Sequence, residues 1–124
     1  MNRDHHVPTG ELLEALAALG FEPADRVQLR FGFEAENSRT AVDLARELRA
    51  RGARRVHVGP RPLGGAASHH RWGVALRTPP IPLDEGEICT LEDEMRAIAA
   101  RHSGRRYLGW RPMLEPPELK RRAS

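Results

Sequence analysis

Residues 87–112 read EICTLEDEMRAIAARHSGRRYLGWRP, and this stretch decides the fold because it holds a whole helix, its end and a strand. Thr90 is placed to cap the helix. Glu92, Asp93 and Glu94 would then lie in the first turn, against the positive end of the helix dipole. We therefore predict a helix that begins at Thr90. Its apolar residues recur at spacings of three and four, which predicts one buried stripe made of Leu91, Met95, Ile98 and Ala99.

The end of this helix and the strand after it are also marked in the sequence. Gly104 is placed to adopt the left-handed conformation that ends many helices, so the helix should stop near Ser103. Tyr107 to Trp110 brings two aromatic residues and a leucine together, a composition typical of a strand. We expect this strand to pack beneath the helix that precedes it.

Two further helices are predicted before this stretch. The first begins with Thr9 as its cap, runs to Leu19 and ends at Gly20. The second is capped by Asn37 or Ser38, runs to about Arg51 and ends at Gly52. Its inner face is predicted to consist of Ala41, Leu44, Ala45 and Leu48. The charges on its outer face, Asp43, Glu47 and Arg51, are expected to be solvated.

Three other segments alternate between apolar and polar residues and are predicted to be strands: 26–34, 54–58 and 70–77. The loop between the last two is rich in proline and glycine, which indicates a hairpin with a mobile tip at 64–68. Segment 78–82 is not expected to pair, because proline lacks the N–H donor. The residues predicted to face the core are Val27, Leu29, Phe31, Phe33, Val56, Val58, Trp72, Val74 and Leu76.

The predicted elements follow the order helix, then strand–helix–strand–strand–helix–strand. This order indicates an α+β fold, a ferredoxin-like βαββαβ sandwich with a four-stranded antiparallel sheet, preceded by an N-terminal helix. The two later helices should cover one face of the sheet and leave the other open. We expect residues 9–112 to form this domain, with a disordered N-terminus at 1–8 and a disordered basic tail at 113–124.

Composition narrows the class of protein. The 124 residues suit one domain, and no apolar run is long enough for a membrane span, so we expect a cytoplasmic protein without membrane contact. The single cysteine, Cys89, excludes an intrachain disulfide. A net charge of +3 permits an anionic partner such as RNA or an acidic protein, and it is equally compatible with a solvated, arginine-rich surface. The oligomeric state stays open.

The sequence gives little support for a catalytic site or a metal site. The histidines at 5, 6, 57, 69, 70 and 102 form no chelating motif, because adjacent residues of a strand point to opposite faces. Cys89, expected just before a helix, has no catalytic signature around it and is interpreted as structural. We expect no catalytic residue, no metal and no cofactor.

Three segments resemble one known family: the leading amphipathic helix, RVQLRFGFE running into a helix that ends ARELRARGA, and above all LEDEMRAIAARHSGRRYLGW. The last is similar to the Leu-Glu helix, glycine stop and Tyr-x-Gly-Trp strand of the RraB family, the regulator of ribonuclease activity B. The resemblance covers roughly residues 9–112. It implies a ferredoxin-like domain without catalytic activity that binds an endoribonuclease of the RNA-degradation machinery and inhibits it by protein–protein contact.

The face of the sheet away from the helices is the candidate partner-binding surface. Its predicted residues are Gln28, Arg30, Arg55, His57, Arg71, Arg77 and, if Leu108 and Trp110 point inward, Tyr107 and Arg111. This basic row suits an acidic protein surface or phosphates, so a nucleic-acid-binding module is the alternative to a ribonuclease regulator. RNA-recognition modules share the topology but stack bases on exposed aromatics, whereas Phe31 and Phe33 are predicted to be buried.

Three glycines are predicted on the same open face: Gly32, Gly73 and Gly109. Glycine in a strand allows another backbone to approach closely. We therefore expect the leading helix or a partner to dock there.

Overall fold

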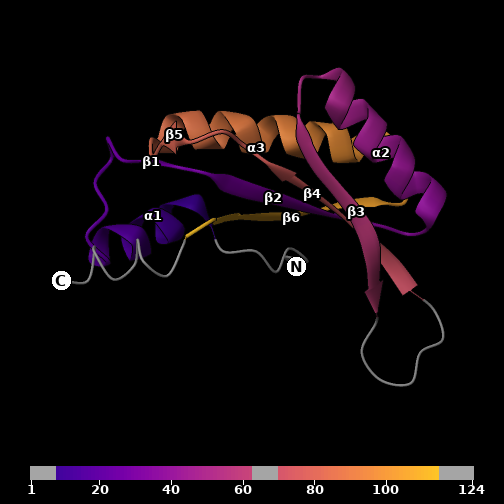
Figure 1. Cartoon of the computed structure of the whole chain (residues 1–124), viewed down its shortest axis with the longest axis horizontal. Coiled ribbons are helices and arrows are strands. Elements are labelled where there is room, and N and C mark those ends of the chain that lie inside the picture. Colours follow the sequence, from indigo (N-terminus) through magenta and orange to yellow (C-terminus); the bar gives the residue numbers. More distant parts are fainter. Residues whose placement is uncertain (1–7, 63–69, 115–124) are drawn as a thin grey trace.

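The computed structural model of the chain describes residues 8–62 and 70–114 (Figure 1). The elements in chain order are α1 Thr9–Ala18, β1 Arg26–Val27, β2 Leu29–Ala35, α2 Ser38–Ala50, β3 Arg55–Pro62, β4 His70–Arg77, β5 Ile81–Pro82, α3 Glu85–Ala100 and β6 Arg105–Pro112. In the described part of the chain, no helix is both long and apolar enough to pass through a membrane.

The fold is α+β, as predicted, and its main layer is a four-stranded antiparallel sheet with the order β3-β4-β2-β6. Helices α2 and α3 lie on the same face of this sheet (Figure 1). Helix α1 contacts α3, and its first residue, Thr9, reaches Trp110 on the edge strand β6. The predicted hairpin is confirmed, since β3 and β4 pair along their whole length.

A second, two-stranded sheet pairs β1 with β5. The predicted strand at 26–34 is therefore divided at Gln28, whose carbonyl accepts a hydrogen bond from Met113 N at 2.8 Å. The expectation that segment 78–82 stays unpaired was wrong, because Ile81 pairs with Val27 and Pro82 with Arg26. This ladder is only two residues long, so the missing proline donor costs it little.

The core follows the predicted alternation in β2 and the predicted face of α2. Leu29, Phe31 and Phe33 are fully buried, and the four inner residues of α2 are buried as well. Val74 and Leu76 are buried as expected, while Trp72 packs at the margin of the core. Val58 was predicted to be buried but is 38% exposed, since β3 is an edge strand.

Two predicted helix starts were wrong and one was right. Asn37 caps α2, its Oδ1 accepting a hydrogen bond from Thr40 N at 2.8 Å. Helix α1 has Pro8 at its cap position, so Thr9 lies inside the helix and its hydroxyl is free for other use. The predicted glycine ends are confirmed by positive φ values at Gly20, Gly52 and Gly104.

Helix α3 begins at Glu85, well before the predicted start at Thr90. Asp84 caps it, with Oδ2 accepting a hydrogen bond from Glu87 N at 2.8 Å. The Thr90 hydroxyl donates to the Gly86 carbonyl within the helix, at 3.0 Å. Glu92 consequently lies in the middle of α3 and faces the interior, so its assignment to dipole compensation was wrong.

The predicted N-terminus at 1–8, tail at 113–124 and loop tip at 64–68 lie mostly or wholly outside the described residues. The first two tail residues are described and belong to the folded unit. The Met113 N–H donates a hydrogen bond to the Gln28 carbonyl, and Leu114 packs against the core.

Candidate functional site

A bulge in β6 decides which side chains reach each face of the sheet. Phe31 is opposite Trp110 and Phe33 opposite Tyr107, with a register shift between them at Gly109, where φ is 103°. Because the bulge adds one residue to β6, Tyr107 and Trp110 point to the same face of the sheet although they are three positions apart instead of two. Tyr107 and Trp110 are therefore both buried on the helix side. The prediction that Tyr107 lies on the open face was wrong.

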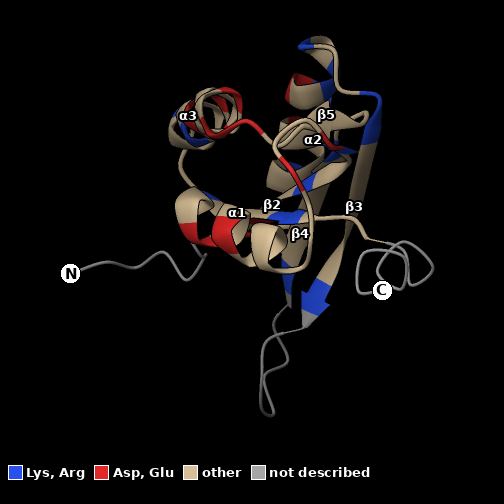
Figure 2. Ribbon diagram, turned by 90° about the vertical axis from the view of Figure 1, so that its left-hand side faces the viewer, with Lys and Arg blue, Asp and Glu red and all other residues tan. Residues whose placement is uncertain are grey.

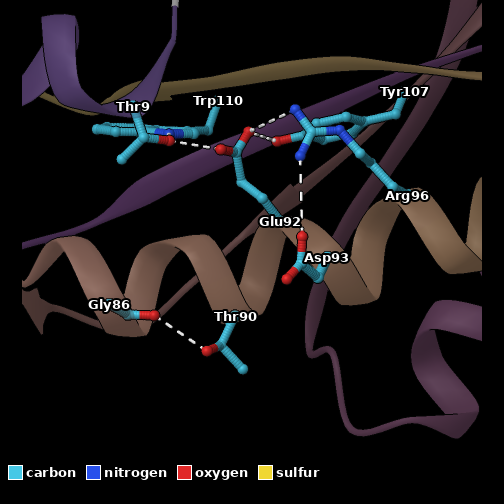
Figure 3. A network of polar contacts seen from close by, with 8 residues as sticks. All are labelled: Thr9, Gly86, Thr90, Glu92, Asp93, Arg96, Tyr107 and Trp110. Carbon is cyan, nitrogen blue, oxygen red and sulfur yellow. Dashed lines mark hydrogen bonds and ion pairs between the residues drawn. The ribbon is translucent and has the colours of Figure 1, made fainter.

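Tyr107 and Trp110 belong to a buried polar network around Glu92, which is only 4% exposed (Figure 3). The Tyr107 hydroxyl donates to Glu92 Oε2 at 2.5 Å, and the Thr9 hydroxyl donates to Glu92 Oε1. Trp110 Nε1 donates in turn to Thr9 Oγ1 at 3.0 Å. One carboxylate thus ties α1, α3 and β6 together.

Arg96 closes this network on the solvent side. Its Nη2 lies 4.0 Å from Glu92 Oε2, and its guanidinium lies 5.4 Å from the centre of the Tyr107 ring. Burial raises the pKa of Tyr107 far above its usual value, and the hydrogen bond to Glu92 and that residue's charge raise it further. Tyr107 therefore stays protonated and keeps its role as a donor.

An ion pair between a buried arginine and a half-buried glutamate joins α2 to β6. Arg105, whose side chain is 3% exposed, donates to Glu47 Oε1 at 2.8 Å and to the Ile98 carbonyl at 2.9 Å. Arg101 and Arg51 also lie within ion-pair distance of Glu47. Burial alone would raise the pKa of Glu47, but the hydrogen bond from Arg105 and the arginine charges outweigh it and lower the pKa. The expectation that Glu47 is solvated was wrong.

The open face carries four arginines in a line, which we call the arginine row. It consists of Arg55 on β3, Arg77 on β4, Arg30 on β2 and Arg111 on β6, each directly opposite the next in the strand register. Basic segments lie along the strands, whereas acidic segments are prominent on α1 and α3 (Figure 2). The arginine row therefore crosses the whole sheet.

Like charges lie opposite one another along the arginine row. Among the described residues, none of the four has a carboxylate within ion-pair distance. Burial lowers the pKa of Arg30, and the charges of Arg111, Arg77 and Arg61 lower it further. The Nε atom of Arg77 is buried and finds no hydrogen-bond partner in the described chain. A negative group at this row would meet donors that are already in place.

Beside the arginine row runs a second row, which we call the small-residue row because three of its four members are glycine or alanine and only the β3 member, His57, has a large side chain. Ala75 and Gly32 are opposite each other, His57 follows Ala75 on β3, and Gly109 follows Gly32 on β6. The small-residue row borders a hollow of about 990 Å³ on this face, and of the arginine row Arg30 and Arg111 line it. Apolar residues close it at the β6 end, namely Leu12, Leu108, Met113 and Leu114.

Of the outward glycines, Gly109 is buried, whereas Gly32 and Gly73 are half-buried. A Cβ at Gly32 would meet Leu108 and the Gly109 carbonyl at 3.9 Å, and one at Gly73 would meet the Arg61 side chain at 3.0 Å. Of α1, only Leu12 borders the hollow. The leading helix thus does not cover Gly32 or Gly73, and docking of a partner over them stays a prediction.

The structure brings most of the predicted site residues together. Arg30, Arg55, Arg77 and Arg111 form the arginine row, with His57 in the next row and exposed Arg71 farther along β4, opposite Arg61. Gln28 borders a smaller cleft of about 520 Å³ between α2 and α3, which Arg55 and Arg77 also line.

Sequence reasoning missed Arg61, which pairs with Glu34 at 3.4 Å on the open face. It was missed because β3 was predicted to end at residue 58. The signal was present in the alternation of Arg55, His57, Gly59 and Arg61, which continues past that point.

The surroundings of Cys89 disfavour a thiolate nucleophile. Cys89 lies within α3, so its expected place before a helix was wrong. Burial raises the pKa of its thiol, and the charges of Glu85, Glu92 and Asp93 raise it further, which disfavours the reactive thiolate. Within residues 8–62 and 70–114, no group of three histidine, cysteine or acidic side chains could hold a metal ion.

The chain matches no protein-family model, no curated protein and no solved structure. Its function therefore has to be argued from the open face and from the residues themselves.

Proposed function

We propose that this chain is a non-catalytic regulator of the RraB type, which binds an RNA-processing endoribonuclease by protein–protein contact through its open sheet face. The βαββαβ part of the chain places its first and third strands, β2 and β4, in the centre of the sheet. That order suits the ferredoxin-like arrangement of two split βαβ units. We accordingly assign the ferredoxin-like topology as part of the proposal.

The residues that carry the resemblance have a structural role. Glu92 of the Leu-Glu helix accepts from Tyr107, the first residue of the Tyr-x-Gly-Trp motif, and Trp110, the last, donates to Thr9. Gly109 forms the bulge that lets both aromatics face the helices. The motif therefore supports a shared fold, and the partner has to be inferred from the surface.

The arginine row is the observation that carries the binding proposal. Like charges directly opposite each other on neighbouring strands destabilise a sheet, so this row costs stability in the free protein. A partner that supplies negative charge would offset the repulsion and gain charge-assisted hydrogen bonds. Such uncompensated charge is typical of a surface maintained for binding.

The aromatic residues favour a protein partner over RNA. All six of them, Phe21, Phe31, Phe33, Trp72, Tyr107 and Trp110, are buried or pack against the core. Among the described residues, the open face consequently offers no Phe, Tyr or Trp ring on which single-stranded RNA could stack. An acidic protein surface needs only the arginines.

An inhibition assay tests this function. The RNA-degradation endoribonuclease of the source organism is assayed for cleavage of a fluorogenic RNA, with and without the purified chain. We expect inhibition by the native chain and by Arg46→Glu, a charge reversal at an exposed position of α2. We expect none from the double variant Arg30→Glu/Arg77→Glu. Absence of inhibition by the native chain, or equal inhibition by all three proteins, contradicts the proposal.

The same assay separates protein binding from RNA binding. If the chain acts by sequestering the substrate, inhibition will depend on the concentration of RNA and will weaken steeply as the salt concentration rises, because binding to the phosphates releases counterions. Inhibition that is independent of RNA concentration supports contact with the enzyme.

A further inference from the structure

The spacing of the arginine row narrows the shape of the segment that it can bind. Neighbouring strands of a sheet lie about 4.8 Å apart, so the four arginines span roughly 14 Å. The turns of an α-helix repeat every ~5.4 Å, and acidic residues at i, i+4, i+7 and i+11 cover roughly 16 Å. A helix that crosses the strands can therefore bring one carboxylate to each arginine, within the reach of these long side chains.

An extended segment fits less well. Side chains on one face of a strand repeat every two residues, or about 6.6 Å, so four of them span roughly 20 Å. Such a segment would run past both edges of the sheet before its fourth carboxylate was paired.

The small-residue row provides the space for such a helix. Gly32 and Ala75 project almost no side chain beside Arg30 and Arg77, so the backbone of a bound helix can approach the sheet closely. At the β6 end, Leu12, Leu108 and Met113 present apolar surface to the same hollow. An amphipathic helix would satisfy both features, with acidic residues over the arginines and an apolar residue at this end.

We propose that the arginine row binds an acidic, amphipathic α-helix of the partner protein, which lies across the four strands above the small-residue row. This inference rests on the proposed function, because it assumes a protein partner, and it names the segment through which that partner binds.

Two isomeric peptides test the helical geometry. The first is an alanine-based helix with four glutamates at i, i+4, i+7 and i+11, and the second has the same composition with the glutamates spread around the helix. Binding is followed by chemical-shift changes in the isotope-labelled chain at low salt. We expect the first peptide to bind about tenfold tighter than its isomer, since only it can pair with all four arginines at once.

Variants of the chain locate the site. We expect Arg30→Gln to weaken binding of the first peptide, and Arg30→Glu/Arg77→Glu to abolish it. Arg46→Glu, with the same kind of charge reversal on α2, should leave binding within about twofold. Far-ultraviolet circular dichroism confirms that each variant is folded, and the milder Arg30→Gln keeps the test valid if the double variant unfolds.

The remaining outcomes overturn the inference in distinguishable ways. Equal affinity for the two isomers, still lost in the double variant, rejects the helix but leaves the arginine row as a protein-binding surface. Tighter binding of a single-stranded RNA oligonucleotide, lost in the same variant, rejects both the helix and the proposed function. Absence of binding by any probe rejects the helix alone, because inhibition of the endoribonuclease is measured independently.

Discussion

Tyr107 donates its hydroxyl hydrogen to Glu92 at 2.5 Å, and this bond joins β6 to α3 in a place where both side chains are buried. Thr9 donates to the other oxygen of the same carboxylate, which anchors α1 as well. Glu92 is therefore the residue on which the relative placement of these three elements depends.

We predict that Glu92→Ala lowers the free energy of unfolding by about 3 kcal/mol. The substitution leaves the hydroxyls of Thr9 and Tyr107 buried without their acceptor, and such groups cost about 1–3 kcal/mol each. The change in the free energy of unfolding is measured by urea denaturation, with tryptophan fluorescence as the signal. Glu94→Ala, at an exposed position of the same helix, is the control and should stay within about 0.5 kcal/mol of the native chain. Equal effects of the two substitutions would refute a special role for Glu92.

The second prediction concerns alkaline pH. The pKa of Tyr107 is raised by burial and by Glu92, so the folded protein holds the phenolic proton at pH values where the unfolded chain, with a pKa near 10.0, releases it. Stability contributed by this group is thus complete below pH 10 and falls as the pH rises above it. Because Tyr107 is the only tyrosine, absorbance at the tyrosinate wavelength should increase only as the protein unfolds. Tyrosinate formation in the folded state near pH 10 would contradict the buried network.

A third prediction follows from the repulsion within the arginine row. Arg30 faces Arg77 on one side and Arg111 on the other, so Arg30→Gln should raise the free energy of unfolding by up to about 1 kcal/mol. Moderate salt should stabilise the native chain more than this variant, because it screens the same repulsion. Thermal denaturation at two salt concentrations measures both effects, with Arg46→Gln as the control. Destabilisation by Arg30→Gln would show that Arg30 contributes to the fold.

A fourth prediction concerns the turn after α3. Gly104 has a φ of 83°, and an added Cβ would lie 2.6 Å from Glu36 Cδ, so Gly104→Ala should lower the free energy of unfolding by more than about 1 kcal/mol. Gly59→Ala is the matched control, because nothing lies within 4 Å of its Cβ position and its φ is not positive. Chemical denaturation should therefore give a lower free energy of unfolding for Gly104→Ala than for Gly59→Ala. A Gly104→Ala variant as stable as the control would be inconsistent with this turn.

The sequence predicted the parts of the fold that depend on local periodicity. Leu29, Phe31 and Phe33 alternate with polar residues, and that period alone specifies which face of β2 is buried. The inner face of α2 and its Asn37 cap follow from equally local rules. The row of arginines was also foreseen as a set, because each member lies out of phase with the core residues of its strand.

Features that depend on contacts between distant residues were not predicted. The orientation of Tyr107 depends on the bulge at Gly109, which adds one residue to β6. A bulge reverses the predicted face of the strand residues on one side of it. The prediction for Glu92 was wrong because Thr90 resembles a cap, although Asp84 followed by Glu87 is a comparable capping signal. Its partners Thr9 and Tyr107 come from other elements, so no local pattern indicates the network.

The most direct test of the central claim, that the arginine row is the partner-binding face, is the affinity of the purified chain for the nuclease-treated endoribonuclease. Biolayer interferometry would compare the native chain, Arg46→Glu and Arg30→Glu/Arg77→Glu, each checked for folding. The account predicts measurable binding by the first two and at least a tenfold loss in the double variant, a change of roughly 1.4 kcal/mol or more in binding free energy. Equal affinity of all three proteins, or binding that disappears when RNA is removed, would contradict it.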